Sequence, residues 1–435
     1  MTELIRYLIR FLLGDHVPEE VAARVGYTSD GVLFPQYKVV IIPSGFFDGG
    51  KFGRADSMPA LPLQQVEDVP LLFGQPTVDR EGETLLVRAD LLAGAFFLLS
   101  RYEETVRREV RDVHGRFPGR ESLPFRAGFM HRPLVDEYGR LLRRWLRQTG
   151  VPVQEPPQRI RHLNLTHDVD APFACRTWRN VVRGLAEGKN LRTLLHLKFG
   201  ALENDPFYTF PWLLREDGQA RTAFGEAHCD IYLFFKSGKS GEKADRPYCD
   251  LHGKEIRQLY SLLRDHRAEV GLHTSYRAGK NPALVTVEKE RLQRAFSRKI
   301  CVNRHHFLAT REPEDMTALE QAGITDDFTM GYADVAGFRL GTSRPVRRID
   351  AVNRRLSALT LHPLTIMDVT LSDSGYMGLS FEEALAHAVR LTDAVRQCNG
   401  ELTLLWHNTS VVEGEGYHRT LYAALLKQMI LDLHT

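Results

Sequence analysis

The chain has 435 residues, which is long for one domain and sufficient for two. Hydrophobic residues make up 43% and charged residues 26%, the ordinary composition of a soluble globular protein. The 57 Lys and Arg residues nearly balance the 55 Asp and Glu residues, and the formal net charge of +2 gives no reason to expect a nucleic-acid partner or an anionic membrane. The 5 cysteines are odd in number and widely spaced, which argues against a disulfide framework or a thiolate zinc site.

The N-terminal segment MTELIRYLIRFLLGDH is apolar, but Arg6 and Arg10 interrupt it, which makes it a poor signal-peptide core. Its apolar residues recur at helical spacing, so an amphipathic helix is the better interpretation. The apolar run at residues 91–99 is far shorter than a bilayer span. We therefore expect a cytoplasmic protein without a transmembrane segment. Peripheral membrane contact through residues 3–13 is the less favoured alternative.

A cluster of Gly and Pro residues, GVPVQEPP at residues 150–157, marks the expected domain boundary, because these residues fit poorly into regular elements. We expect a smaller N-terminal accessory domain of mixed α/β structure at 1–157 and a second domain at 158–435. The expected elements of the first part are a strand at 39–45 and helices at 89–110 and 134–148. This part lacks the spacing of a catalytic motif.

In the second part, short β-rich apolar runs alternate with longer helical or loop segments. The runs lie at 161–166, 230–235, 269–274, 301–307, 324–330, 364–369 and 401–406. Strands that alternate with helices predict a largely parallel sheet. Seven such strands favour a barrel over an open sheet.

Polar residues gather where these strands end, which in a β/α barrel is the rim that holds active sites. Asp168 and Asp170 follow the first strand, two residues apart and therefore on one side of an extended chain. The later strand ends contribute His273, the pair Arg304 and His306, and His407. One Asp and two His form a usual ligand set for a divalent transition metal with open positions.

Each of these residues also has a structural interpretation. An Asp at a strand end is more often a cap or turn residue, and a single His such as His273 is more often a hydrogen-bonded residue of the interior. Their occurrence at successive strand ends favours a joint site. Tyr276, or a backbone N–H beside it, could donate to an oxyanion. Trp406 and Tyr332 could stack on a sugar ring or belong to the core, with equal weight.

The ordered segments THDVD, GLHTSY, NRHHFL, DDFTMGYADVAGFRLGT and LLWHN resemble the motifs of the NodB-homology polysaccharide deacetylases over residues 160–412. The nearest resemblance is to a divergent, mostly bacterial subgroup whose first motif is HDVD. The first part resembles the domain that precedes such deacetylases, through IIPSGFF, LLAGAFFLLSRYEE, HGRF and HRPLVDEY. The resemblance implies a distorted seven-stranded β/α barrel that removes an acetyl group from an N-acetylated sugar.

Carried over by position, Asp168 resembles the catalytic base and Asp170 the metal-binding Asp. His273 resembles the first metal-binding His. Arg304 resembles the arginine that orients the base, and His407 resembles the acid that protonates the leaving amine. The resemblance thus implies a divalent cation, with zinc expected, and a carbohydrate or glycan-precursor substrate.

The sequence departs from the family pattern at two places. Val169 separates two aspartates that are adjacent in the commonest form of the first motif. Arg277 stands four residues after His273, where the family has its second metal-binding His. His306 is the expected substitute, because it shares a strand side with Arg304. Either Asp326 or Asp327 could take the role of the fourth motif.

The expected activity is that of a metal-dependent amide hydrolase that removes an acyl group from a carbohydrate. Two alternatives remain open. The replacement of the usual His by Arg277 motivates a carbohydrate-binding protein that has lost catalysis. A hydrolase of a non-sugar amide would keep the same site. The sequence does not determine the oligomeric state.

Overall fold

The computed structural model describes residues 1–238, 242–311 and 314–434, and they form two compact units. The first unit consists of Met1–Arg161, Met330–Thr365 and Asp393–Glu401. The second unit consists of His162–Thr329, Ile366–Thr392 and Leu402–Thr435, masked residues aside. Two segments from late in the chain therefore group with the N-terminal residues. The domain division at residue 157 stays a prediction.

The first unit contains a small mixed sheet in the order β1-β2-β6-β5, in which only the pair β5 and β6 is antiparallel. Two antiparallel pairs, β3 with β4 and β12 with β13, complete its strands. The strands are β1 (Val25–Tyr27), β2 (Val39–Ile41), β3 (Gln64–Val66), β4 (Val69–Leu71), β5 (Gly74–Glu81), β6 (Thr84–Ala89), β12 (Val346–Asp350) and β13 (Arg355–Pro363). The pair β12 and β13 was not predicted from the sequence.

The helices of the first unit pack through apolar faces, with contacts between α1, α3 and α6. Their bounds are α1 (Thr2–Leu13), α2 (Glu19–Ala22), α3 (Leu91–Leu99), α4 (Tyr102–Val106), α5 (Leu123–Arg126) and α6 (Leu134–Gln148). The single long helix expected at 89–110 is wrong, because Arg101 adopts a left-handed conformation with φ 54° and separates α3 from α4. Right-handed helix geometry cannot continue through such a residue.

The second unit has the α/β architecture that the sequence predicted. Its strands lie in the order β11-β10-β9-β8-β7-β15-β14, and the neighbouring pairs with a printed register are parallel. Their bounds are β7 (His162–Val169), β8 (Cys229–Phe235), β9 (Glu269–Thr274), β10 (Val302–His305), β11 (Asp326–Met330), β14 (Ile366–Met367) and β15 (Glu401–Leu405). The closure of seven strands into a barrel stays a prediction.

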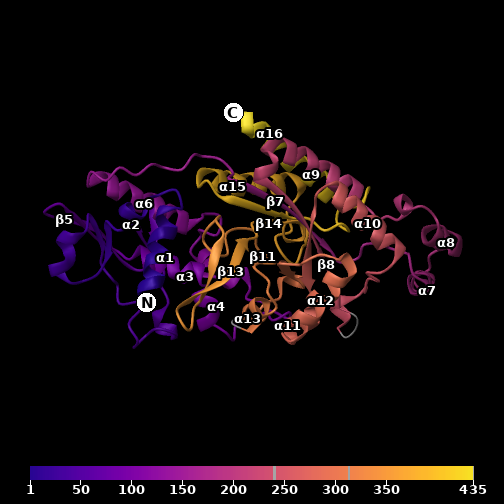
Figure 1. Cartoon of the computed structure of the whole chain (residues 1–435), viewed down its shortest axis with the longest axis horizontal. Helices are drawn as coiled ribbons and strands as arrows, with labels where there is room; N and C mark the ends of the chain where they lie inside the picture. The colour runs from indigo at the N-terminus through magenta and orange to yellow at the C-terminus, as the bar shows by residue number, and fades with distance from the viewer. Residues whose placement is uncertain (239–241, 312–313, 435) are drawn as a thin grey trace. The chain divides into compact units, whose positions relative to one another are not determined.

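Helices flank these strands, as Figure 1 shows, with α9 against β8 and α12 against β9. The helices are α7 (Trp178–Ala186), α8 (Leu191–Phe199), α9 (Phe210–Phe224), α10 (Lys254–Asp265), α11 (Tyr276–Lys280), α12 (Leu284–Phe296), α13 (Glu314–Gln321), α14 (Asp368–Ser372), α15 (Phe381–Gln397) and α16 (His418–Leu431). None of the helices in the described residues is long and apolar enough to cross a bilayer.

Parallel pairing sets the position of the polar strand ends. His273 in β9 is the register partner of Arg304 in β10, and Asp168 in β7 is the partner of Phe234 in β8. All these strands run in the same direction, so their carboxyl ends meet at one edge. The candidate site lies at this edge.

Candidate metal centre and active site

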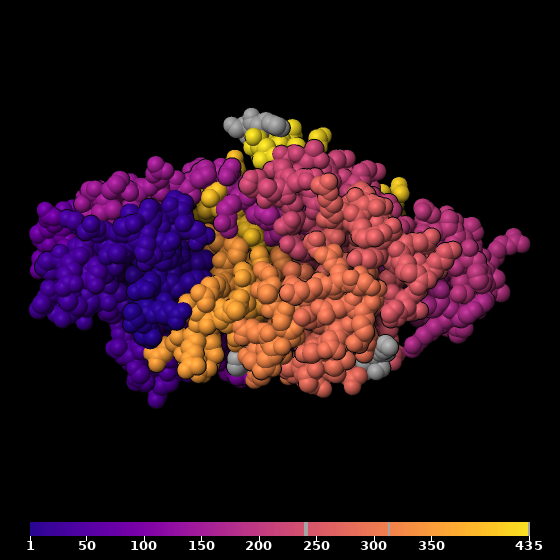
Figure 2. All heavy atoms as spheres, in the orientation of Figure 1, coloured from indigo at the N-terminus to yellow at the C-terminus, as the bar shows by residue number. Residues whose placement is uncertain are grey.

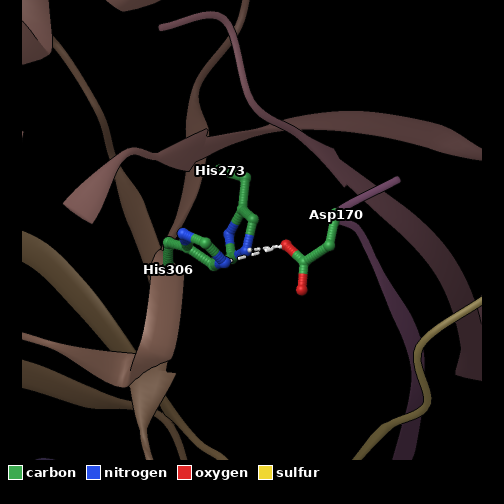
Figure 3. Close-up of side chains that lie close together, drawn as sticks. All are labelled: Asp170, His273 and His306. Carbon is green, nitrogen blue, oxygen red and sulfur yellow. Dashed lines mark ion pairs between the residues drawn. The ribbon is translucent and has the colours of Figure 1, made fainter. Parts of the chain in front are cut away.

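Asp170, His273 and His306 converge at the carboxyl ends of β7, β9 and β10, as Figure 3 shows. Their ligand-type atoms all lie within 4.8 Å of one another. Asp170 Oδ1 is 3.3 Å from His273 Nε2 and 3.1 Å from His306 Nε2. The structure therefore brings together the three residues predicted as a metal triad.

Hydrogen bonds fix both imidazole rings with Nε2 toward Asp170. His273 Nδ1 lies 2.9 Å from the carbonyl oxygen of Arg304, and His306 Nδ1 lies 3.1 Å from Asp245 Oδ1. Partners of this kind hold the proton on Nδ1 and leave the Nε2 lone pair for a cation.

The donor set fits a divalent cation. Within the described part of the chain, the buried atoms Asp170 Oδ1 and His273 Nε2 make no hydrogen bond. Buried polar atoms are rarely left in this way, and a cation between them would satisfy both. One carboxylate and two imidazoles are ligands that zinc and similar transition metals accept.

The charges of the triad are coupled. Burial opposes ionisation of Asp170, but His306, His273 and Lys236 outweigh it and hold the pKa of its carboxyl well below the ordinary value. Burial likewise disfavours protonated His306, but Asp170 and Asp245 raise the pKa of its imidazole. The buried ammonium of Lys236 lies 3.7 Å from Asp170 Oδ1 and places a positive charge beside the carboxylate.

Asp168 lies beside the triad and is held by Arg304. Arg304 Nη1 donates to Asp168 Oδ1 at 3.1 Å and to Thr166 Oγ1 at 2.8 Å. The guanidinium is fully buried over the Phe234 ring, 4.7 Å from its centre. Because Oδ1 is engaged by Arg304, Oδ2 is the oxygen that faces His273, 3.6 Å from its Nε2.

His407 approaches the same carboxylates from the end of β15. Its Nε2 lies 4.0 Å from Asp168 Oδ2 and 3.9 Å from Asp170 Oδ2. Asp368, at the start of α14, accepts from Nδ1 at 2.9 Å and from the backbone N–H at 2.8 Å. Burial disfavours the imidazolium, but Asp368 and the two site carboxylates outweigh this effect and raise the pKa of His407 to about 10. His407 therefore carries a proton at neutral pH.

Arg277, which stands where the sequence resemblance implied a second metal-binding His, is exposed on α11. The Arg277 backbone N–H donates to Asp245 Oδ2 at 3.0 Å, and the Tyr276 N–H donates to Asp245 Oδ1 at 2.7 Å. Asp245 thereby links this helix to His306. The Tyr276 side chain is buried and packs on Phe307, with ring centres 5.6 Å apart.

The other aromatic candidates are core residues in this structure. Trp406 is fully buried, packs on Tyr422 with ring centres 4.9 Å apart, and donates its indole N–H to the His418 carbonyl oxygen at 3.1 Å. Tyr332 belongs to the first unit, where it is buried in a hydrophobic cluster with Phe117, Met130 and Val335. These environments favour the structural interpretation that the sequence left open.

Of the two alternatives for the fourth motif, Asp327 is the buried residue. It accepts from Asn303 Nδ2 at 2.8 Å and from Thr329 Oγ1 at 2.7 Å. Sequence reasoning did not select Asp245, Lys236 or Asp368. Asp368 was detectable, because it lies next to the end of the strand predicted at 364–369. Lys236 was detectable too, because it directly follows the predicted strand at 230–235. Asp245 ends a short 3-10 helix, Lys243–Asp245, and has no distinctive spacing.

Comparisons with known proteins give one family model and a similar solved structure. A family model described as "Family of unknown function (DUF7033)" matches residues 15–151. No curated protein matches. Among solved structures, the chain is similar to the crystal structure of a "putative polysaccharide deacetylase" from Mycobacterium smegmatis, with 13% identity and a TM-score of 0.39. The similarity covers 65% of this chain and 86% of that one.

Proposed function

We propose that the chain is a metal-dependent hydrolase that removes an acyl group, most simply N-acetyl, from a carbohydrate or glycan precursor. The strongest support is that the triad of Asp170, His273 and His306 converges with two further side chains. These are Asp168 and His407. This combination supplies a cation site, a carboxylate base and a protonated acid within one edge of the sheet. The substrate class, an amide of a carbohydrate, is inferred from the resemblance of the sequence motifs to those of polysaccharide deacetylases.

In the proposed mechanism, Asp170, His273 and His306 hold a divalent cation, with zinc the expected ion. When bound, such an ion supplies Lewis-acid polarisation of the acyl oxygen and favours ionisation of water. Asp168 takes the proton from the attacking water through Oδ2, because Arg304 occupies Oδ1.

His407 acts as the acid in the second half of the reaction. Its pKa is raised to about 10, so it enters the reaction protonated. The proton leaves from Nε2 to the amine, because Nδ1 is held by Asp368. An amine is a poor leaving group unless it is protonated, so this transfer completes amide cleavage. The proposed distorted seven-stranded barrel would present all these groups at its rim.

A non-catalytic binding protein is the second candidate, and one contact favours it. Lys236 Nζ lies 3.7 Å from Asp170 Oδ1, where its positive charge opposes a cation. If this opposition dominates, the site binds no metal and performs no hydrolysis.

The test combines metal analysis with acetate release. Purified protein is loaded with zinc, and its metal content is measured beside acetate release from N-acetylglucosamine oligomers. We expect about one ion per chain and acetate release that a chelator abolishes. A chain that binds the oligomers but neither retains metal nor releases acetate would support the second candidate instead.

A further inference from the structure

A pair of short helices, α7 (Trp178–Ala186) and α8 (Leu191–Phe199), is inserted between β7 and α9. In Figure 1 both lie at the edge of the second unit, away from its labelled strands, and Figure 2 shows the same segment at the surface. The helices are held together by a small cluster of Cys175, Val181 and Leu194. A Cβ on Gly184 would lie 2.6 Å from the Leu194 side chain, so the close approach of the helices requires glycine there. The pair is therefore a packed element rather than a loose loop.

The outer face of this pair is apolar and exposed. Trp178, Val182 and Leu185 are 59%, 64% and 43% exposed, and their spacing places them on one face of α7. Leu191 and Phe199 of α8 are 50% and 68% exposed. The rings of Trp178 and Phe199 lie 5.7 Å apart and join the two faces. These residues are 5 of the 14 exposed large hydrophobic residues among those described, although they lie within 22 positions of sequence.

The same pair is strongly basic. Between positions 178 and 199 there are five basic residues, Arg179, Arg183, Lys189, Arg192 and Lys198, against the single acidic residue Glu187. The ammonium of Lys198 lies 4.9 Å from the Trp178 ring centre and 5.0 Å from that of Phe199. Arg183 and Lys189 both lie near Glu187, at 3.6 and 3.3 Å, and the pair of helices still carries an excess of basic residues. The whole chain, by contrast, has a formal net charge of only +2.

We propose that α7 and α8 dock the second unit onto a lipid bilayer that contains anionic lipids. Helices with an apolar face, an aromatic anchor and flanking basic residues bind in the interfacial plane, because apolar side chains enter the acyl boundary while cations contact headgroups. A second copy of the chain is a poorer occupant, because its identical face would bring like charges together. Docking here is peripheral, and it requires no spanning helix.

The experiment is vesicle sedimentation with the full chain at low and high salt. Phosphatidylcholine vesicles are compared with vesicles that also contain phosphatidylglycerol. We expect binding to the anionic vesicles, little binding to the neutral ones, and a loss at high salt because the attraction is partly electrostatic. Trp178→Ser/Phe199→Ser and, separately, Arg179→Glu/Arg183→Glu should each lower the partition coefficient at least about tenfold.

The matched control is Val32→Ser/Val113→Ser, which removes two apolar residues that are 82% and 92% exposed on the first unit. It should bind as the parent does. The charge-reversal variant alters exposed side chains only, so it keeps the test valid if the aromatic variant unfolds. Absence of binding to anionic vesicles, or equal binding to neutral ones, would overturn the proposal. The proposal would also be overturned if the parent chain bound no vesicles but formed a dimer in sedimentation velocity, and if the aromatic variant were a monomer.

Discussion

Asp368 accepts hydrogen bonds from both the ring and the backbone of His407, with distances of 2.9 Å to Nδ1 and 2.8 Å to the backbone nitrogen. This double contact fixes the ring plane and directs Nε2 toward Asp168 and Asp170. Asp368 is itself fully buried, so water does not compete for its oxygens. The position and the charge of His407 therefore both depend on Asp368.

Replacement of Asp368 by Asn should weaken His407 as an acid. The negative charge that raises the pKa of His407 to about 10 would be gone, so the pKa should fall and the imidazolium should lose its proton at lower pH. The alkaline limb of the kcat profile should move to lower pH, and kcat should fall by about 10- to 100-fold. The exposed Asp373→Asn is the matched control. An unchanged pH profile in Asp368→Asn would show that His407 is not the acid.

Metal binding should release protons and weaken as pH falls. The pKa of His306 is raised, chiefly by Asp170 working against burial, and a cation can bind only the neutral imidazole. Below this raised pKa, a proton must leave before the ion binds, so the affinity should decrease as pH decreases. Titration calorimetry in buffers of different ionisation enthalpy measures the protons released. A zinc affinity that does not change across this range would contradict the proposed ligand set.

Lys236→Met should bind zinc more tightly than the parent chain. The Lys236 ammonium, 3.7 Å from Asp170 Oδ1, stabilises the carboxylate and repels an incoming cation. Its removal should raise zinc affinity by about tenfold, since a unit charge a few ångströms away contributes on the order of 1 kcal/mol or more. Lys280→Met, which removes an exposed ammonium paired with Glu242, is the control. A weaker zinc affinity in Lys236→Met would mean that Lys236 supports the metal site instead.

A buried ion pair in the first unit should matter more for stability than the surface pairs. Arg339 donates to both carboxylate oxygens of Glu104, at 2.9 and 2.6 Å, and both side chains are buried. Glu104→Gln leaves the Arg339 charge uncompensated and should lower the free energy of unfolding by about 3–5 kcal/mol. The exposed Glu109→Gln should change it by less than about 0.5 kcal/mol. Urea denaturation measures both variants.

The effect of Glu104 should also depend on pH. Burial opposes its ionisation, but Arg339 and Arg101 outweigh burial and lower the pKa of the Glu104 carboxyl. The contribution of the Glu104 carboxylate to the free energy of unfolding is therefore complete above the pKa of the unfolded state. It is lost as pH falls through the lowered pKa of the folded state. The stability difference between Glu104→Gln and the parent should narrow in acid. A difference that stays constant there would contradict this assignment.

The convergence of the candidate ligand residues could be predicted from sequence because parallel strands impose a simple geometry. Asp168 and Asp170, or Arg304 and His306, share a side at a spacing of two, and carboxyl ends of parallel strands meet at one edge. Convergence of His273 with these groups follows from its place at the end of β9. No knowledge of helix packing was needed for this part of the site.

The supporting residues could not be predicted in this way. Asp245 contacts His306 from a short 3-10 helix, Lys243–Asp245, in the connection between β8 and α10, and the path of such a connection depends on tertiary packing rather than on a sequence period. The helix break at Arg101 could not be predicted either, because arginine has a high helix propensity. Only the left-handed backbone of Arg101 in the structure separates α3 from α4. Glu104 lies in the segment expected as one long helix, and its buried contact with Arg339, which is distant in sequence, could not be read from that segment.

The most direct test measures turnover and zinc content together in Asp168→Asn and Asp170→Asn. Asp168→Asn should keep full zinc occupancy but lose at least about 100-fold in acetate release per folded molecule, because an amide oxygen cannot take the proton. Its melting temperature should fall, because the fully buried Arg304 loses its carboxylate partner. Asp170→Asn should lose zinc, and excess zinc should partly restore its activity. Full zinc occupancy with retained acetate release in Asp168→Asn would contradict the assignment of Asp168 as the base, and with it the proposed mechanism.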